Sequence, residues 1–298
     1  MVEKPAVRPD VAVGEALRAV ARDILAEARA VLNDQKKPDA TAVHDFRKAM
    51  KRWRAMLRLL EPFLGDDGRR LRAQARDFAR EVAGARDAQS AIEALEDLVD
   101  DKVPLSTRTV ASIRGRLDET RLSAEAAQLT QALRARFIIA LDAAETAVAA
   151  WPLEITFAEL ARELADAYKL ARDDAPGGDW REVDAEVLHD LRRRVVAHRY
   201  QMELVEPLWP RLGRSWVREA QKLRNRLGKI QDLAVLARYA EPHQPLARWR
   251  SRLQSVISQR QAQHIAVSRR IAGRLFAEKP KSFRRRLEAM WDGMAASR

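Results

Sequence analysis

The sequence contains no cysteine, which excludes disulfide bonds, thiolate catalysis and cysteine-ligated metal sites in this chain. Glycine and proline are scarce, with 11 and 12 among 298 residues, and runs of β-branched residues with alternating polarity are absent. A strand-rich fold needs such runs and frequent turns. Alanine, leucine, arginine and glutamate instead fill long segments with helical period, and they predict an almost entirely α-helical protein.

Long hydrophobic segments are missing as well. The most apolar segment, residues 137–151, is interrupted by Asp142 and Glu145, which makes it unsuited to crossing a bilayer. The N-terminal segment, residues 1–17, lacks the apolar region of a signal peptide. These features predict a cytoplasmic protein that does not enter the membrane.

Acidic residues are outnumbered by basic ones. Lysine and arginine total 55 against 43 aspartates and glutamates, which gives a formal charge of +12. Such an excess favours an anionic partner, but it does not choose among nucleic acid, acidic lipid and phosphate. Hydrophobic residues make up 47% of the chain, enough for a substantial core, and the length predicts two domains of about 150 residues each.

Capping and helix-breaking residues divide the chain into expected helices. Pro62 should end the second helix, because proline lacks a backbone donor and disfavours helical geometry at the preceding residue. Thr156 and Glu159 form a capping-box signature, and Ser106 or Thr107 should cap an earlier helix. The expected helices span about residues 10–32, 41–60, 67–98 with a bend near Gly84, 106–150 with an interruption near 122–123, 157–172, 184–205, 212–227, 231–240, 246–277, and a last one from 282.

The most basic of these helices lies in residues 43–65, which read VHDFRKAMKRWRAMLRLLEPFLG. On a helix with about 100° per residue, the basic side chains fall within about 80° on either side of His44, and apolar side chains such as Phe46 and Trp53 lie opposite. One face is therefore expected to join the core. The other face carries Arg47, Lys48, Lys51, Arg52, Arg54 and Arg58.

The same pattern occurs a second time as LHDLRRRVVAHRYQMELVEPLWP. At a constant offset of 145 residues and without a gap, His44 aligns with His189, and both copies continue to a Glu-Pro pair. Shared composition rarely produces such a register. The sequence therefore predicts duplicated helical bundles, residues 1–150 and 151–298, whose histidine-arginine faces approach a common cleft.

Particular motifs in both halves carry a resemblance to a known family. His44 begins the pattern H-x-x-R-K-x-x-K-R-x-R, and G-x-R-D follows at Gly84–Asp87. The second half has LHDLRRR from Leu188 and LGKIQDL over Leu227–Leu233. In these motifs, spread over nearly the whole chain, the sequence resembles the CHAD family, the conserved histidine α-helical domain. The resemblance implies an all-α fold of two pseudo-symmetric four-helix bundles whose basic helices line a central groove or pore. It also implies binding of inorganic polyphosphate and, in some members, association with polyphosphate granules.

Polyphosphate offers charged oxygens and no bases, so a site for it needs many cations and little stacking surface. Arginine binds oxygen pairs and lysine supplies mobile charge. The two aligned histidines could also donate to phosphate oxygens, more strongly if acid or the anion protonates them. The expected ligands are His44, Arg47, Lys48, Lys51, Arg52, Arg54 and Arg58, then Arg72, Arg76 and Arg80 on the third helix, and His189, Arg192, Arg193, Arg199, Lys222 and Arg226 in the second half.

The second half is expected to bind more weakly than the first. Val196 and Ala197 stand where the first half has Lys51 and Arg52, so the second basic face is thinner. His198 lies on the opposite side of its helix, toward the core, and is not expected to be a ligand.

The same residues allow other interpretations. A basic face can simply be solvated, although matched positions in two halves argue against this. Asp87 and Asp232 are expected to cap a helix or pair with arginine, and Glu182, Asp184 and Glu186 suit the start of a helix. Metalloprotease, P-loop and nucleophile-elbow motifs are absent from the sequence. We therefore expect no catalytic residue, metal site or cofactor.

The leading hypothesis is a protein that binds polyphosphate without reacting with it. The alternative is a protein that binds RNA or single-stranded DNA, but the basic face lacks the interleaved aromatic residues that stack on bases. A third hypothesis, an enzyme acting on phosphorylated nucleotides or polyphosphate, lacks a recognisable nucleophile or general base.

Overall fold

The computed structural model describes residues 5–82, 86–101, 103–123 and 129–297. These residues form α-helices and short 3-10 turns and contain no strand, which confirms the all-α prediction. The helices are α1 (Val13–Asn33), α2 (Asp39–Glu81), α3 (Arg86–Asp100), α4 (Thr107–Ser123), α5 (Gln131–Ala149), α6 (Phe157–Asp173), α7 (Ala185–Val205), α8 (Pro210–Tyr239), α9 (Arg250–Leu275) and α10 (Pro280–Ala296).

The predicted helix starts are confirmed where capping residues signalled them. At α6 the Glu159 backbone N–H donates to Thr156 Oγ1 at 3.3 Å, and the Thr156 N–H donates to the Glu159 carboxylate at 2.8 Å. Ser106 Oγ accepts from the Thr109 N–H at 3.2 Å at the start of α4. Each of these bonds satisfies a backbone donor that a helix N-terminus otherwise leaves unpaired.

Pro62 does not end the second helix, contrary to the prediction. The helix continues through Pro62 and bends at Gly65, whose φ of 56° and ψ of −129° are non-helical, and it then resumes as far as Glu81. Proline removes one backbone hydrogen bond, whereas a positive φ turns the chain itself, and glycine adopts it without a Cβ penalty. The bend that we expected near Gly84 lies outside the described residues.

The break expected between residues 227 and 231 is also wrong, because α8 is continuous from Pro210 to Tyr239. Gly228 lies inside this helix, and a Cβ there would come within 3.3 Å of Arg192 Nη2 on α7. This glycine therefore leaves room for a neighbouring side chain and does not interrupt the helix.

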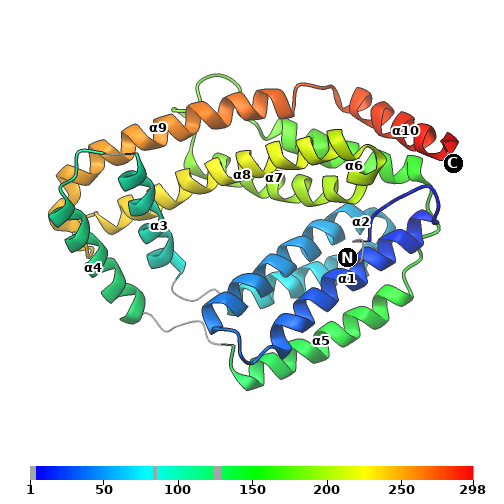
Figure 1. Cartoon of the computed structure of the whole chain (residues 1–298), viewed down its shortest axis with the longest axis horizontal. Helices are drawn as coiled ribbons and strands as arrows, with labels where there is room; N and C mark the ends of the chain where they lie inside the picture. The colour runs from blue at the N-terminus through cyan, green and yellow to red at the C-terminus, as the bar shows by residue number, and fades with distance from the viewer. Residues whose placement is uncertain (1–4, 83–85, 102, 124–128, 298) are drawn as a thin grey trace.

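The buried side chains form two hydrophobic clusters. The larger joins both halves of the chain and includes Phe46 of α2, Phe137 of α5 and Phe283 of α10. The smaller unites α3 and α4 with α8 and α9, through residues such as Leu95 and Leu253. Accordingly, α3 and α4 lie beside α8 and α9 at one end of the molecule, away from α1, α2 and α5 (left in Figure 1). The domain boundary expected at residue 150 and the duplication both stay predictions.

The two basic helices come together in the fold, since α2 packs against α7. At this crossing the Gln201 amide nitrogen donates to the Ala55 carbonyl oxygen at 3.4 Å. Within the described residues, each helix is too short or too polar to span a membrane.

Candidate functional site

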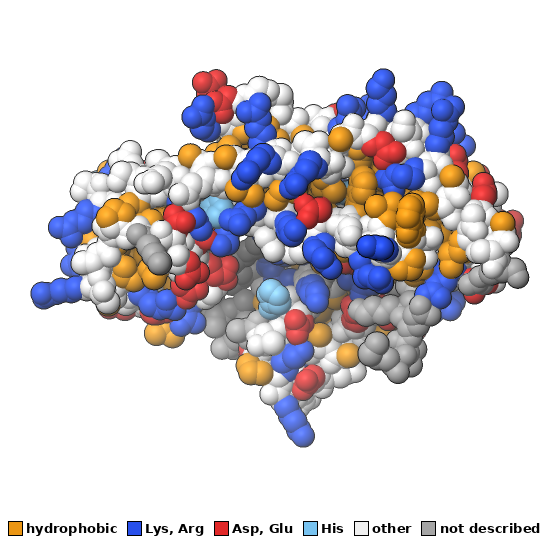
Figure 2. All heavy atoms as spheres, turned by 45° about the horizontal axis from the view of Figure 1, so that its top comes forward, with side chains coloured by type: hydrophobic (Ala, Val, Ile, Leu, Met, Phe, Trp, Pro, Cys, Tyr) orange, Lys and Arg blue, Asp and Glu red, His pale blue; other side chains and the backbone are white. Residues whose placement is uncertain are grey.

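A cavity of about 920 Å³ lies between α2 and α7, with α3, α8 and α9 completing its wall. Figure 2 shows a hollow in the molecular surface with lysine and arginine side chains around it and a histidine at its edge. The cavity thus lies where the two basic helices predicted from the sequence meet.

One side of the cavity is basic because a single face of α2 borders it. Arg47, Lys51, Arg54 and Arg58 follow one another at spacings of four, three and four, and Arg72 adds a cation from beyond the bend at Gly65. The bend brings the two parts of α2 together, so that Arg47 Nη1 donates to the Ala79 carbonyl oxygen at 2.9 Å. Arg72 forms an ion pair of 2.9 Å with Glu61 across the same bend.

Arg54 and Arg58 have no counter-ion among the described residues. Among the described residues, neither forms a hydrogen bond or an ion pair. Burial lowers the pKa of Arg54, and the positive charges of Arg76 and Arg72 lower it further. Burial and the nearby cations Arg194 and Arg72 lower the pKa of Arg58 to about 10. Both guanidinium groups remain charged at neutral pH, so this part of the wall is a concentration of uncompensated positive charge.

The facing wall is more polar than cationic. From α7 it receives His189, Arg192 and Arg193. Gln231 of α8 hydrogen-bonds Nδ1 of His189 at 2.7 Å and also accepts from Arg192. Arg193 pairs with Asp190 on its own helix. Protein groups therefore already hold two of the α7 cations.

Three of the predicted ligands lie outside this cavity, on the other flank of the basic helices. Lys48, Arg52 and Arg199 line a second cavity of about 450 Å³. There Arg52 pairs with Glu27 at 2.5 Å, and Arg199 pairs with Glu203. The sequence pattern predicted one basic face that spans about 160° of the circumference of α2. In the structure the cations of this face are divided between two cavities, one on each side of the helix.

Lys222 and Arg226 also lie outside the cavity. Lys222 forms an ion pair of 2.6 Å with Glu219, and Arg226 contacts His264 at 3.1 Å. The side of α8 that borders the cavity instead carries residues seven apart, which share a helix face. These residues are Arg224, Gln231 and Arg238. They were not selected from the sequence, although their spacing of seven residues was visible there.

The remaining predicted ligands, at the start of α2 and beyond its bend, do not line the cavity. His44 is exposed, so the two aligned histidines are not equivalent. Arg76 and Arg80 lie close enough to Arg54 to lower its pKa, but Arg76 pairs with Asp77 at 3.1 Å and Arg80 lies 3.9 Å from the same carboxylate.

His198 lies in the core, as predicted. It is 1% exposed, and its Nε2 accepts from Trp216 Nε1 at 2.8 Å. Burial lowers the pKa of His198 to about 3, so this imidazole is neutral at physiological pH.

Three carboxylates, Asp87, Glu186 and Asp232, are also part of the cavity wall. Asp87 lies in the first turn of α3 and pairs with Arg238 at 3.3 Å. Its position agrees with the expected role at a helix start and in an ion pair. In the part of the chain that the structure describes, no group of three histidines or carboxylates could hold a metal ion.

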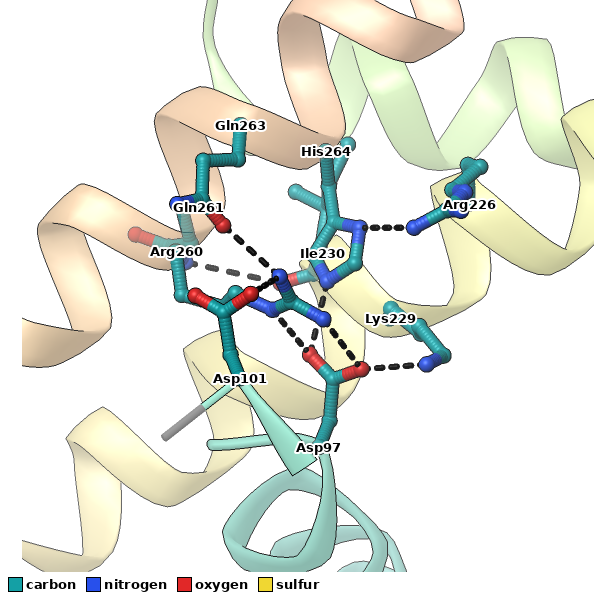
Figure 3. Close-up of polar contacts among 9 residues, drawn as sticks. All are labelled: Asp97, Asp101, Arg226, Lys229, Ile230, Arg260, Gln261, Gln263 and His264. Carbon is teal, nitrogen blue, oxygen red and sulfur yellow. Dashed lines mark hydrogen bonds and ion pairs between the residues drawn. The ribbon is translucent and has the colours of Figure 1, made fainter. Parts of the chain in front are cut away.

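A separate polar cluster lies between α3, α8 and α9 (Figure 3). Asp97 is 4% exposed and accepts from His264 Nε2 at 2.7 Å and from Arg260 Nε at 2.8 Å. Lys229 also binds it, and Asp101 binds the outer side of Arg260. These interactions attach α3 to α8 and α9, which form part of the cavity wall.

Comparisons with known proteins agree with this fold. A search of curated proteins gives no match. The CHAD domain from the plant Ricinus communis is similar in structure, with a TM-score of 0.59 and 18% identity over 91% of this chain and 94% of that chain. PptA from Streptomyces chartreusis has the same TM-score of 0.59, with 17% identity over 89% of this chain and 99% of that chain. Since the family model for the CHAD domain matches residues 15–241, more than half of the sequence, the chain belongs to the CHAD domain family.

Proposed function

We propose that this protein binds inorganic polyphosphate, without chemical change, in the cavity between α2 and α7. The observation that carries the proposal is the pair Arg54 and Arg58, which are partly buried, charged and without a counter-ion among the described residues. Two like charges that are partly buried and have no counter-ion destabilise the folded protein. A bound polyanion offsets this cost, so the wall is suited to a ligand of high negative charge.

The arrangement of the cations favours a chain of phosphates over a single phosphate. From Arg47 to Arg58 the basic face of α2 extends about 16 Å along the helix axis. Arginine forks bind oxygen pairs, and Lys51 adds a mobile charge between them. An extended anion contacts all of these groups at once, whereas one phosphate reaches only a part of them.

Nucleic acid is the weaker candidate. Among the described residues that line the cavity there is no phenylalanine, tyrosine or tryptophan. Single-stranded nucleic acids gain much of their affinity by stacking on such rings. Polyphosphate needs no stacking surface, and the resemblance of the histidine helices to those of the CHAD family implies the same ligand.

The two walls contribute unequally in this proposal. Five cations of α2 border the cavity, and two of them, Arg54 and Arg58, have no counter-ion among the described residues. On α7, Gln231 and Asp190 already engage Arg192 and Arg193. The first half is therefore the stronger binding wall. In the cell, such binding would direct a cytoplasmic protein to polyphosphate granules.

Calorimetric titration of the full chain with long-chain polyphosphate at several salt concentrations tests the proposal. We expect an affinity that falls steeply with salt, by about 0.7 in log K per log salt for each neutralised phosphate if polyphosphate behaves as single-stranded nucleic acid does. Single-stranded RNA at equal phosphate concentration should compete poorly. Preferential binding of RNA, or polyphosphate binding no tighter than that of orthophosphate, would overturn the proposal. Release of orthophosphate during the titration would overturn its non-catalytic part.

A further inference from the structure

Gln231 on α8 contacts two cavity residues of α7 at once. Its side-chain nitrogen lies 2.7 Å from Nδ1 of His189, and its side-chain oxygen contacts Nη1 of Arg192. All three residues belong to the cavity wall. Gln231 carries no charge and lies within the LGKIQDL motif of the second half.

The chemistry of the three groups fixes the proton on the histidine. A guanidinium has only donors, so the glutamine atom that faces Arg192 must be the carbonyl oxygen. The amide NH₂ of Gln231 then faces His189, and because it only donates, Nδ1 must accept. A neutral imidazole with an accepting Nδ1 carries its proton on Nε2. Neither the orientation of the amide nor the tautomer is a free choice.

The packing of Arg192 supports this arrangement. Its guanidinium lies against Gly228, one turn before Gln231 on α8. A Cβ at Gly228 would approach Arg192 Nη2 to 3.3 Å and Cζ to 3.6 Å. A residue without a side chain therefore allows the arginine to lie close enough to α8 to reach the amide oxygen.

We infer that Gln231 is a positioning residue that holds His189 in the tautomer with its proton on Nε2, so that this N–H is a donor at the cavity wall. The inference rests on the proposed function in one respect: it names a phosphate oxygen as the atom that accepts a hydrogen bond from this N–H. It also changes the expectation that protonation strengthens the histidine contact. A proton on Nδ1 would remove the acceptor of Gln231, so acid weakens the arrangement that orients the ring.

Several charged side chains from the surrounding helices line the cavity together with His189. On α7, Glu186 and Arg193 share its wall, and α8 adds Asp232. From α2 come Arg47 and Lys51, and from α3 comes Asp87. Within the described cavity lining, His189 is the only histidine, and histidine is the side chain whose ordinary pKa lies between pH 5 and 8.

The tautomer can be measured directly by ¹⁵N NMR of the full chain without ligand, with the His189 signals assigned by comparison with a His189→Asn variant. We expect a protonated Nε2 and an unprotonated Nδ1 at pH 8. A protonated Nδ1 in the neutral ring would overturn the inference. This measurement is independent of polyphosphate, so it stands even if the proposed function fails.

The isosteric variant Gln231→Glu tests the effect on binding. Its carboxylate only accepts, so it binds Arg192 and draws a proton onto Nδ1 of His189. With long-chain polyphosphate at constant salt, we expect the affinity of this variant to rise about tenfold from pH 8 to pH 6, because His189 becomes a cation. The rise for wild type should be smaller, because a proton on Nδ1 of His189 costs the hydrogen bond from the Gln231 amide.

A double variant with Gln231→Glu and His189→Asn is the control. Its pH dependence should disappear, since the group that takes up the proton is gone. Identical pH profiles for Gln231→Glu and wild type, or a dependence that persists without His189, would contradict the role of Gln231.

Discussion

Asp97 and His264 lie 167 residues apart in the chain, yet the histidine Nε2 is 2.7 Å from the aspartate Oδ2 in the interior. Arg226 contacts the other ring nitrogen at 3.1 Å and can only donate, so Nδ1 accepts and Nε2 is the donor to Asp97. Burial alone would raise the pKa of Asp97, but hydrogen bonds from His264, Arg260 and Lys229 outweigh it and hold the pKa far below its usual range. The carboxylate is therefore the electrostatic centre of the junction between α3, α8 and α9.

Replacement of Asp97 by asparagine should destabilise the protein by about 3 to 5 kcal/mol, because it leaves Arg260 and Lys229 without their buried counter-charge. Since the pKa of Asp97 is lowered in the folded state, its stabilising effect is complete above pH 4 or so and declines as the pH falls further. Urea unfolding at neutral pH measures the loss. The control is Asp101→Asn, whose side chain is 30% exposed and which should cost about 1 kcal/mol or less. Equal losses for the two variants would contradict a central role for Asp97.

Arg58→Met should stabilise the ligand-free protein while it weakens polyphosphate binding. The pKa of Arg58 is lowered because burial and neighbouring cations disfavour its charge, and at neutral pH the folded state bears that cost in full. Removal of the charge should raise Tm by about 2 °C, and saturating polyphosphate should raise the Tm of this variant less than that of wild type. Arg72→Met is the comparison, since Arg72 has Glu61 as a counter-ion and should gain no stability. A lower Tm for ligand-free Arg58→Met would count against the electrostatic explanation.

Two triple variants that remove equal charge distinguish the two cavities. The first replaces the cations of the larger cavity, Arg47, Lys51 and Arg54, by alanine, and the second replaces Lys48, Arg52 and Arg199. We expect the first to reduce the slope of log K against log salt by about 2 and the second to leave it nearly unchanged. Titrations with polyphosphate at four salt concentrations give both slopes. Equal slopes would show that net charge, and not the cavity, determines binding.

Two double variants test the inequality of the walls. Arg54→Ala with Arg58→Ala removes two cations from α2, and Arg192→Ala with Arg193→Ala removes two from α7. Gln231 and Asp190 already hold the α7 pair, whereas Arg54 and Arg58 have no counter-ion among the described residues. We therefore expect the α2 pair to cause the larger loss of affinity. Equal losses, measured under one salt condition, would refute a dominant first half.

His198 predicts a specific dependence of stability on pH. Its pKa is about 3 in the fold because of burial and near 6.5 in the unfolded chain, so between these values the unfolded state binds the additional proton. Stability must then decrease as the pH falls through this range, by about 1.4 kcal/mol per pH unit from this residue. His198→Gln retains an acceptor for Trp216 and should remove that part of the slope. Unfolding free energies at pH 4, 5 and 6 give the comparison, and an unchanged slope would contradict a neutral buried imidazole.

Local patterns in the sequence were sufficient for the all-α class, for the capped helix starts and for the basic face, but not for every helix end, as Pro62 shows. Thr156 with Glu159 predicted the start of α6 because a capping box involves only residues three apart. His198 was assigned to the core because helical period alone separates it from His189. The basic side of α2 was predicted for the same reason, and four of its cations do line the cavity.

Only the tertiary structure decided which cations share a site. Arg52 and Arg54 are two residues apart, yet they border different cavities: α1 contributes to the wall beside Arg52, whereas α3, α8 and α9 contribute to the wall beside Arg54. Gln231 carries no charge, and although it lies in the LGKIQDL motif, its contacts with His189 and Arg192 depend on the position of α8 beside α7. The sequence by itself determined the helices, their amphipathic faces and the excess of positive charge. Helix packing determined where that charge has a protein counter-ion and where it does not, since long-range contacts are not encoded in any local period.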